Sequence, residues 1–252
     1  VGVFGRAFCD FGPSFTVVDA NGEAAKECVI SNIVIDGDTA TVTVHEEKRH
    51  GLTNNSFVTF KEIKGTSQLN GCEPKAVKVV DGFSFKVTGC AKFSAYVEAG
   101  IMVEVKQPTQ MTFRPLRACL EDPGNLMLYD LGKFEAPQQV HLAFATLDAF
   151  HTAHGDYPEP FNKEHETEFL KLGTELSSDE KLSDGAEYLL TEMCRTCRGR
   201  LNPICAVFGG YVGQEVLKAC SAKFTPTHQF FYMDFCEMLP SRTEGEEFAV
   251  TC

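Results

Sequence analysis

The spacing of apolar residues changes near Pro108, and this change constrains the fold more than any other feature of the sequence. Before Pro108, short runs alternate apolar and polar residues, as residues 39–45 do. Further runs of this kind occupy residues 57–63, 76–80, 83–87 and 101–105. Turn dipeptides such as Asp36-Gly37 separate the runs and favour tight hairpins. The pattern predicts a small antiparallel β barrel or sandwich over residues 13–106.

After Pro108 the apolar residues follow a helical period. Residues 140–150 and 186–197 repeat apolar side chains at every third or fourth position, which places them on one stripe of a helix. Residues 164–176 share this spacing and carry acidic residues in the first turn, where the helix dipole favours negative charge. The second half therefore predicts a helical bundle of about four segments over residues 107–201.

A third part begins near residue 202. Residues 205–220 indicate one helix, and the aromatic run 229–234 that follows indicates a buried strand. Residues 6–11 are also typical of a strand. A helix followed directly by a buried strand is an α/β pattern, which neither the barrel nor the bundle explains. We expect residues 1–12 and 202–252 to belong to one α/β sheet that the other two parts interrupt.

Charge and hydropathy exclude two classes of partner. The 35 acidic and 23 basic residues give a net charge of −12, and the basic residues do not cluster. Nucleic-acid binding needs clustered cations, so we expect no nucleic-acid partner. No apolar run reaches the roughly 20 residues of a membrane span, so we expect no membrane segment. Because the sequence begins without Met and ends without a clear boundary, we expect it to be a piece of a larger protein.

Eleven cysteines at irregular spacing, in a chain long enough to form a core, indicate reduced cytosolic thiols. Cys194 and Cys197 form a CxxC pair, which is the spacing of thiol redox enzymes. Those enzymes place the pair at a helix N-terminus, whereas this pair comes late in a helical stripe. Two thiols on an ordinary helix are the favoured interpretation, and a stand-alone thiol redox protein is the alternative.

Two other motifs have a chemical and a structural interpretation. His151 and His154 lie one helical turn apart, but no third ligand is recognisable, so we expect no metal site. Gly209, Gly210 and Gly213 could hold a phosphate at a helix start. They follow residues that already have a helical pattern, which favours close packing of this helix against a neighbour. The residues alone favour an intracellular binding segment over a free-standing enzyme.

Four stretches in a fixed order carry a resemblance to a known family. They are GRAFCDFG at 5–12, KRHGL at 48–52, VHLAFATLDAF at 140–150, and AVFGG at 206–210, which is followed by QEVLKACS at 214–221. Together they resemble the eukaryotic ubiquitin-activating enzyme over nearly the whole chain.

The resemblance implies a division of the chain. Residues 13–106 would form the first catalytic cysteine half-domain as a β barrel, and residues 107–201 a four-helix bundle. Residues 1–12 and 202–252 would belong to a Rossmann-like inactive adenylation domain.

The resemblance also implies an activity for the whole enzyme. The family uses ATP and Mg²⁺ to adenylate the C-terminus of ubiquitin, captures ubiquitin as a thioester and passes it to a conjugating enzyme. Its nucleotide site and its nucleophile follow the region matched here. We therefore expect this chain alone to be inactive and to bind no cofactor, with the active adenylation domain of the same polypeptide as a partner. The expected location is the cytoplasm and nucleus.

For site residues, the resemblance implies that ubiquitin or a close ubiquitin-like protein contacts the loop formed by Arg49, His50, Gly51 and Leu52. A loop at the end of a hairpin can present a guanidinium, an imidazole and an apolar side chain. From the residues alone an ordinary solvated turn is the favoured interpretation, whereas the resemblance implies a ubiquitin-binding surface on the barrel.

A second predicted set lies on one helix and has a packing role within the adenylation domain. Its members are Phe208, Gly209, Gly210, Gln214 and Glu215. The resemblance implies no catalytic residue here, since the first cysteine half-domain of the family does not supply the nucleophile. In addition, nothing adjacent to the barrel thiols Cys28, Cys72 and Cys90 suggests an activating base or dipole.

Overall fold

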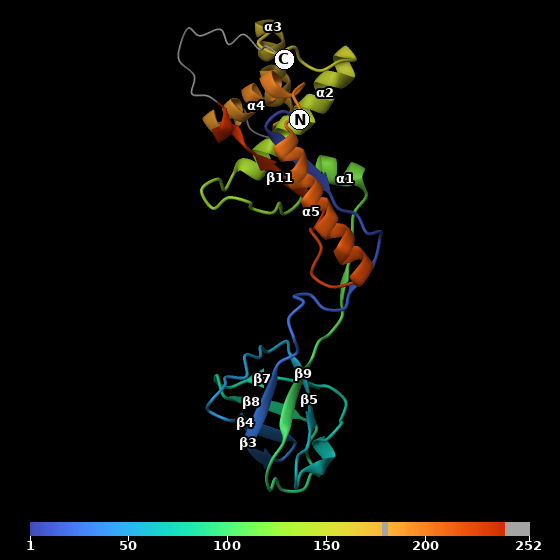
Figure 1. Ribbon diagram of the computed structural model, residues 1–252, viewed down its shortest axis with the longest axis vertical. Helices are drawn as coiled ribbons and strands as arrows, with labels where there is room; N and C mark the ends of the chain where they lie inside the picture. The colour runs from blue at the N-terminus through green and yellow to red at the C-terminus, as the bar shows by residue number, and fades with distance from the viewer. Residues whose placement is uncertain (178–180, 240–252) are drawn as a thin grey trace. The chain divides into compact units, whose positions relative to one another are not determined.

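The computed structural model describes residues 1–177 and 181–239 (Figure 1). The chain divides into two compact units, which are described separately. The barrel unit comprises Thr16–Met111 and Ala222–Thr225; the helical unit comprises Val1–Phe15, Thr112–Ser221 and the described residues from Pro226 onward. Within the described residues, no helix combines the length and the apolar character needed to cross a membrane.

Seven short strands form the main sheet of the barrel unit. They are β3 (Glu27–Asp36), β4 (Thr39–Val44), β5 (Phe57–Lys61), β6 (Lys75–Ala76), β7 (Lys78–Val79), β8 (Ser84–Thr88) and β9 (Ile101–Val105). Their order in the sheet is β6-β5-β9-β3-β4-β8-β7, and neighbouring strands pair antiparallel. A 3-10 turn (Ser67–Leu69) follows β5, and β2 (Phe15–Val17) pairs with β10 (Thr109–Met111) in a separate sheet.

One chain segment brings the two ends of the sheet together, so that the sheet is a nearly closed barrel. The edge strands β6 and β7 are separated only by Val77, so consecutive residues pair with β5 on one side and with β8 on the other. Val77 itself is buried. The two end strands are only two residues long each and are joined to one another, which limits edge-to-edge aggregation. The predicted small antiparallel barrel is confirmed.

Side chains alternate between the barrel core and the surface, as the sequence pattern requires. Ala40, Val42 and Val44 of β4 are fully buried, and they pack with Phe60 and Phe85 from other strands. The tight turn at Gly37 has a φ of +59°, which glycine adopts without strain. The predicted hairpin at this dipeptide therefore joins β3 to β4.

The longest strand, β3, is not among those expected from the sequence. Its pairing with β4 shifts register between Ile30 and Asn32, which marks a β-bulge. Cys28 and Ile30 point into the core before the bulge, whereas Ile33 does so after it. The bulge moves the buried apolar residues from even to odd positions, so the alternation breaks in the middle of the strand. The sequence therefore lacks the continuous alternation of apolar and polar residues that predicts a strand.

Five helices make up most of the helical unit. They are α1 (Leu116–Glu121), α2 (Ala136–His154), α3 (Lys163–Leu176), α4 (Asp184–Thr196) and α5 (Asn202–Ser221). The helices α2, α3 and α4 pack on one another as the predicted bundle, and Cys119 of the short α1 lies in the same core (Figure 1). Asn162 and Ser183 cap α3 and α4 through hydrogen bonds from backbone amides. Gly173 lets α3 approach α4, since a Cβ there would lie 2.1 Å from a methyl of Leu190.

A two-stranded ribbon joins opposite ends of the described chain. Strand β1 (Phe4–Phe8) pairs antiparallel with β11 (Phe230–Asp234), which a 3-10 turn (Cys236–Met238) follows. Phe230 and Tyr232 face α2, whereas Phe231 packs against Phe208 of α5, so the ribbon is buried on both faces. The helix-then-strand pattern is therefore present. The two strands alone do not make a Rossmann sheet, so that finer assignment stays a prediction.

His141 connects three elements of the helical unit. Its Nε2 lies 3.2 Å from the carbonyl oxygen of Leu120, which can only accept, so Nε2 carries the proton. Its Nδ1 therefore accepts from the hydroxyl of Tyr232 at 2.7 Å. Burial lowers the pKa of His141 below its ordinary value of 6.5, and the nearby Arg6 lowers it further. The imidazole is therefore held neutral between α1, α2 and β11.

This arrangement predicts a loss of stability in mild acid. The unfolded chain binds a proton at His141 more readily than the folded chain, so the contribution of the neutral imidazole is present above about pH 6.5 and is lost below it. Urea unfolding at pH 7.5 and pH 5.5 should show a larger drop for the native chain than for His141→Gln. The exposed His151, replaced by Gln, serves as the control and should leave the drop unchanged; an equal drop in all three proteins would contradict the assignment.

Candidate functional site

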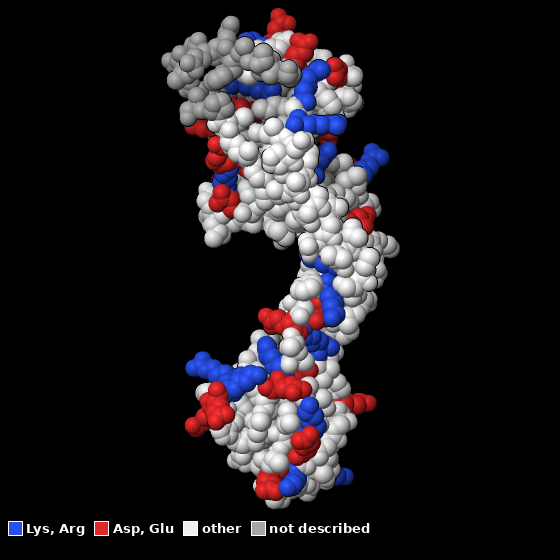
Figure 2. Space-filling model, in the orientation of Figure 1, with Lys and Arg blue, Asp and Glu red and all other residues white. Residues whose placement is uncertain are grey.

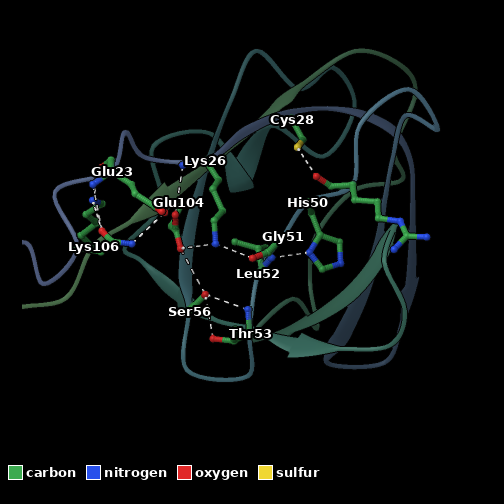
Figure 3. A network of polar contacts seen from close by, with 12 residues as sticks. Glu23, Lys26, Cys28, His50, Gly51, Leu52, Thr53, Ser56, Glu104 and Lys106 are labelled. Carbon is green, nitrogen blue, oxygen red and sulfur yellow. Dashed lines mark hydrogen bonds and ion pairs between the residues drawn. The ribbon is translucent and has the colours of Figure 1, made fainter. Parts of the chain in front are cut away.

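The predicted binding loop lies between β4 and β5, and the His50 side chain anchors it. Only 2% of His50 is exposed. The amide of Leu52 donates to His50 Nδ1 at 2.9 Å, so the proton of the neutral ring is on Nε2. Nε2 in turn donates to the carbonyl oxygen of Asp81 at 2.8 Å. Both ring nitrogens are thus engaged inside the barrel unit. Figure 3 shows the bond between Leu52 and His50.

A second set of contacts fixes the far side of the loop. Lys26 Nζ donates to the carbonyl oxygen of Gly51 at 2.5 Å and lies 3.9 Å from the carboxylate of Glu104. Glu104 also accepts from the hydroxyl of Ser56, which accepts from the amide of Thr53 (Figure 3). Gly51 has a φ of +62°, a conformation that favours glycine. The loop is therefore braced at both ends by hydrogen bonds.

Arg49 projects from this braced loop into solvent. Its guanidinium carbon lies 5.8 Å from the ring centroid of Phe83, within the range of a cation–π contact. Its carbonyl oxygen lies 3.9 Å from the thiol of Cys28. Among the described residues no carboxylate forms an ion pair with Arg49. The guanidinium is therefore available to a partner molecule.

The structure revises which parts of the predicted loop reach the surface. Arg49 and Gly51 are exposed, whereas the side chains of His50 and Leu52 lie in the core. The expected presentation of an imidazole and an apolar side chain is therefore not found. The cause is the turn at Asp81, because the carbonyl oxygen of Asp81 accepts a hydrogen bond from the imidazole and holds the ring in the core. Sequence spacing alone does not place this turn beside the loop.

The second predicted set, on α5, divides into packed and exposed residues. Phe208 packs against Phe231, and 7% of Glu215 is exposed. Gly209, Gly210 and Gln214 are exposed, and apart from the neighbouring backbone of α5 itself no described atom lies within 4 Å of a Cβ built on either glycine. The expected close packing at these glycines does not occur within the described residues.

The open face of α5 is apolar and nearly uncharged. Between 47% and 60% of each of four large apolar side chains is exposed; these are Val207, Val212, Val216 and Leu217. The only charged residues on the helix are Glu215 and Lys218. The region of α5 is correspondingly almost free of charge colour in Figure 2, whereas both signs alternate over the visible face of the barrel. An exposed apolar face of this kind is typical of a surface that another protein part covers.

Glu215 ties α5 to the segment that leads into β11. Its carboxylate accepts from the amide and hydroxyl of Thr227 at 3.0 and 3.1 Å and from Lys218 Nζ at 2.6 Å. The thiol of Cys9 lies 3.9 Å away, and burial together with this carboxylate raises the pKa of Cys9 to about 12. A buried, fully bonded carboxylate of this kind has a positioning role.

The CxxC pair does not have the properties of a redox site. Both thiols are buried in the core of the helical unit. Burial raises the pKa of Cys194 to about 12 and that of Cys197 to about 11. A reactive thiol needs a lowered pKa, because the thiolate is the nucleophile. The thiol redox alternative is therefore disfavoured.

Other candidate groups show equally ordinary environments. Burial raises the pKa of the barrel thiols Cys28, Cys72 and Cys90, so none is an activated nucleophile. His154 pairs with Glu168 at 3.0 Å. Over residues 1–177 and 181–239, no group of three or more His, Cys, Asp or Glu side chains could hold a metal ion.

The glycines of the helical unit offer a matched test of this packing. A Cβ on Gly5 would lie 1.8 Å from the ring of Phe208, so Gly5→Ala should destabilise the chain by about 1–3 kcal/mol. Gly209→Ala has open space and should stabilise α5 by about 0.5–1 kcal/mol through helix propensity. Urea unfolding measures both. Destabilisation by Gly209→Ala would mean that the face of α5 is covered within this chain.

Comparison with known proteins agrees with this architecture. A family model described as the ubiquitin-activating enzyme E1 FCCH domain matches residues 37–106, and one described as the ubiquitin-activating enzyme E1 four-helix bundle matches residues 107–177. Together the two matches cover more than half of the chain; the first spans the barrel strands from β4 to β9, and the second spans α1 to α3.

Individual relatives extend the similarity over nearly the whole chain. Ubiquitin-activating enzyme E1 2 of Arabidopsis thaliana is 39% identical over 243 residues, which is 95% of this chain and 22% of that protein. Ubiquitin-activating enzyme E1 1 of Candida albicans is 39% identical over 96% of the chain and 24% of the relative. Ubiquitin-like modifier-activating enzyme 1 of Mus musculus is 37% identical over 97% and 23%, respectively. The chain thus spans less than a quarter of these relatives, and it belongs to the ubiquitin-activating enzyme E1 family.

Proposed function

We propose that this chain is the part of a ubiquitin-activating enzyme that contacts ubiquitin through its barrel and scaffolds adenylation through α5, without supplying a catalytic group. The observation that carries the proposal is Arg49, an exposed guanidinium without a carboxylate partner among the described residues, on a loop that hydrogen bonds brace on both sides. Such a group is prepared to bind an acidic surface at little entropic cost.

The whole enzyme supplies the chemistry in this proposal. ATP and Mg²⁺ bind in the active adenylation domain, where the C-terminus of ubiquitin is adenylated, and a thiol elsewhere in the polypeptide then captures it as a thioester. Ubiquitin-conjugating enzymes receive the product, and the enzyme works in the cytoplasm and nucleus. The raised pKa values of Cys28, Cys194 and Cys197 support a role for this chain outside the thioester step.

The face of α5 is the second contact surface in this proposal. The active adenylation domain of the same polypeptide covers Gly209 and Gly210 and the apolar side chains beside them, within a Rossmann-like domain that β1 and β11 help to form. The support is the open, nearly uncharged surface around these glycines, which lets a neighbouring backbone approach closely.

The ubiquitin contact predicts a specific loss of affinity. Arg49→Ala removes one exposed charged contact worth up to about 1 kcal/mol, so the dissociation constant should rise about two- to fivefold. A titration of ¹⁵N-labelled ubiquitin with the 252-residue chain measures it. Arg117→Ala removes an exposed arginine from the helical unit and should bind as the native chain does. If the native chain does not perturb ubiquitin saturably, or if the two variants bind equally, the contact is assigned wrongly.

A further inference from the structure

A second turn of the barrel lies beside the predicted binding loop. This turn, residues 81–84, joins β7 to β8. Hydrogen bonds within the turn fix its conformation, because the carboxylate of Asp81 accepts from the amides of Phe83 and Ser84 at 2.8 Å each. The carbonyl oxygen of Phe83 accepts from the amide of Val44, at the end of β4. The backbone of Phe83 is thus fixed, and its ring is half-buried beneath the guanidinium of Arg49.

His50 is the link between this turn and the loop. Its side chain donates from Nε2 to the carbonyl oxygen of Asp81, and its backbone amide donates to the carbonyl oxygen of Gly82 at 3.2 Å. Its Nδ1 accepts from the amide of Leu52. The ring also meets the Phe85 ring edge to face at 5.5 Å. One buried side chain therefore ties the position of Arg49 to the position of the turn.

A groove runs along this pair of segments. Its volume is about 870 Å³, and its lining includes Arg49, Phe83, Ser84, His45 and Glu46. The guanidinium attracts a carboxylate, whereas Glu46 in the same groove repels a uniformly negative ligand. The lining therefore suits the mixed charges of a folded protein surface better than a polyanion.

We propose that the ubiquitin-contacting surface is a composite of the loop and the turn, in which Phe83 supports the Arg49 guanidinium against a carboxylate of ubiquitin and His50 is the positioning residue. This inference rests on the proposed function, because ubiquitin is its partner. It adds Phe83, which the loop alone does not contain, and it gives the buried His50 a role that needs no direct contact.

The first experiment tests the aromatic support. Phe83→Leu keeps an apolar side chain and removes the ring face, so ubiquitin affinity should fall about two- to fivefold. Phe57→Leu changes another half-buried phenylalanine of the same barrel, outside the groove, and should leave affinity unchanged. The readout is the same titration of labelled ubiquitin, with thermal unfolding of each variant to compare stability.

The second experiment separates positioning from simple stabilisation. His50→Gln offers an amide nitrogen near the place of Nε2 and keeps the bond to Asp81, whereas His50→Asn offers an oxygen near Nδ1 and keeps only the bond to Leu52. Affinity should fall for Asn and be retained for Gln, even where both variants lose stability. Long-range ¹H–¹⁵N correlation spectra of the native chain, which need no variant, should show His50 protonated at Nε2.

These experiments distinguish failure of the composite surface from failure of the proposed ubiquitin contact. Native affinity in both Phe83→Leu and His50→Asn, together with weakened binding by Arg49→Ala, overturns the composite surface and leaves the ubiquitin contact standing. A proton on Nδ1 of His50 overturns the positioning role. Absence of saturable ubiquitin binding by the native chain overturns the proposed function, and this inference with it.

Discussion

The hydrogen-bonded pairing of β1 with β11 is the constraint on which the helical unit depends. Phe4 pairs with Asp234 and Phe8 pairs with Phe230. The chain between these two strands therefore starts and ends at the same small sheet. Aromatic side chains on both faces of the ribbon then bury it between α2 and α5. The barrel and the bundle can therefore both be inserted between β1 and β11 without breaking the hydrogen bonds that pair these strands.

The two proposed contact surfaces use opposite physical means. On the barrel, a single charge is carried by a loop that polar groups hold in place, the buried His50 and the half-buried Lys26. On α5, glycines and exposed aliphatic side chains form a face that is nearly uncharged. The first arrangement suits a reversible partner, and the second suits a permanent neighbour in the same polypeptide.

Sequence patterns predicted the local elements well where a single period persists. The alternation around Val42 and the helical stripe through Phe144 both correspond to observed elements. The bulge near Ile30 hid the longest strand, because it shifts the phase of the alternation. The burial of His50 was also out of reach, because its partner carbonyl at Asp81 is 31 residues away and only the fold brings the two together. Long-range polar contacts of this kind leave no periodic signal.

Amide hydrogen exchange with and without ubiquitin tests the central claim most directly, because it reports on every segment of the chain at once. With saturating ubiquitin, exchange should slow in residues 45–56 and 79–85 of the barrel and stay unchanged along α5. Slowing confined to α5 or the bundle, with the barrel unaffected, would contradict the account.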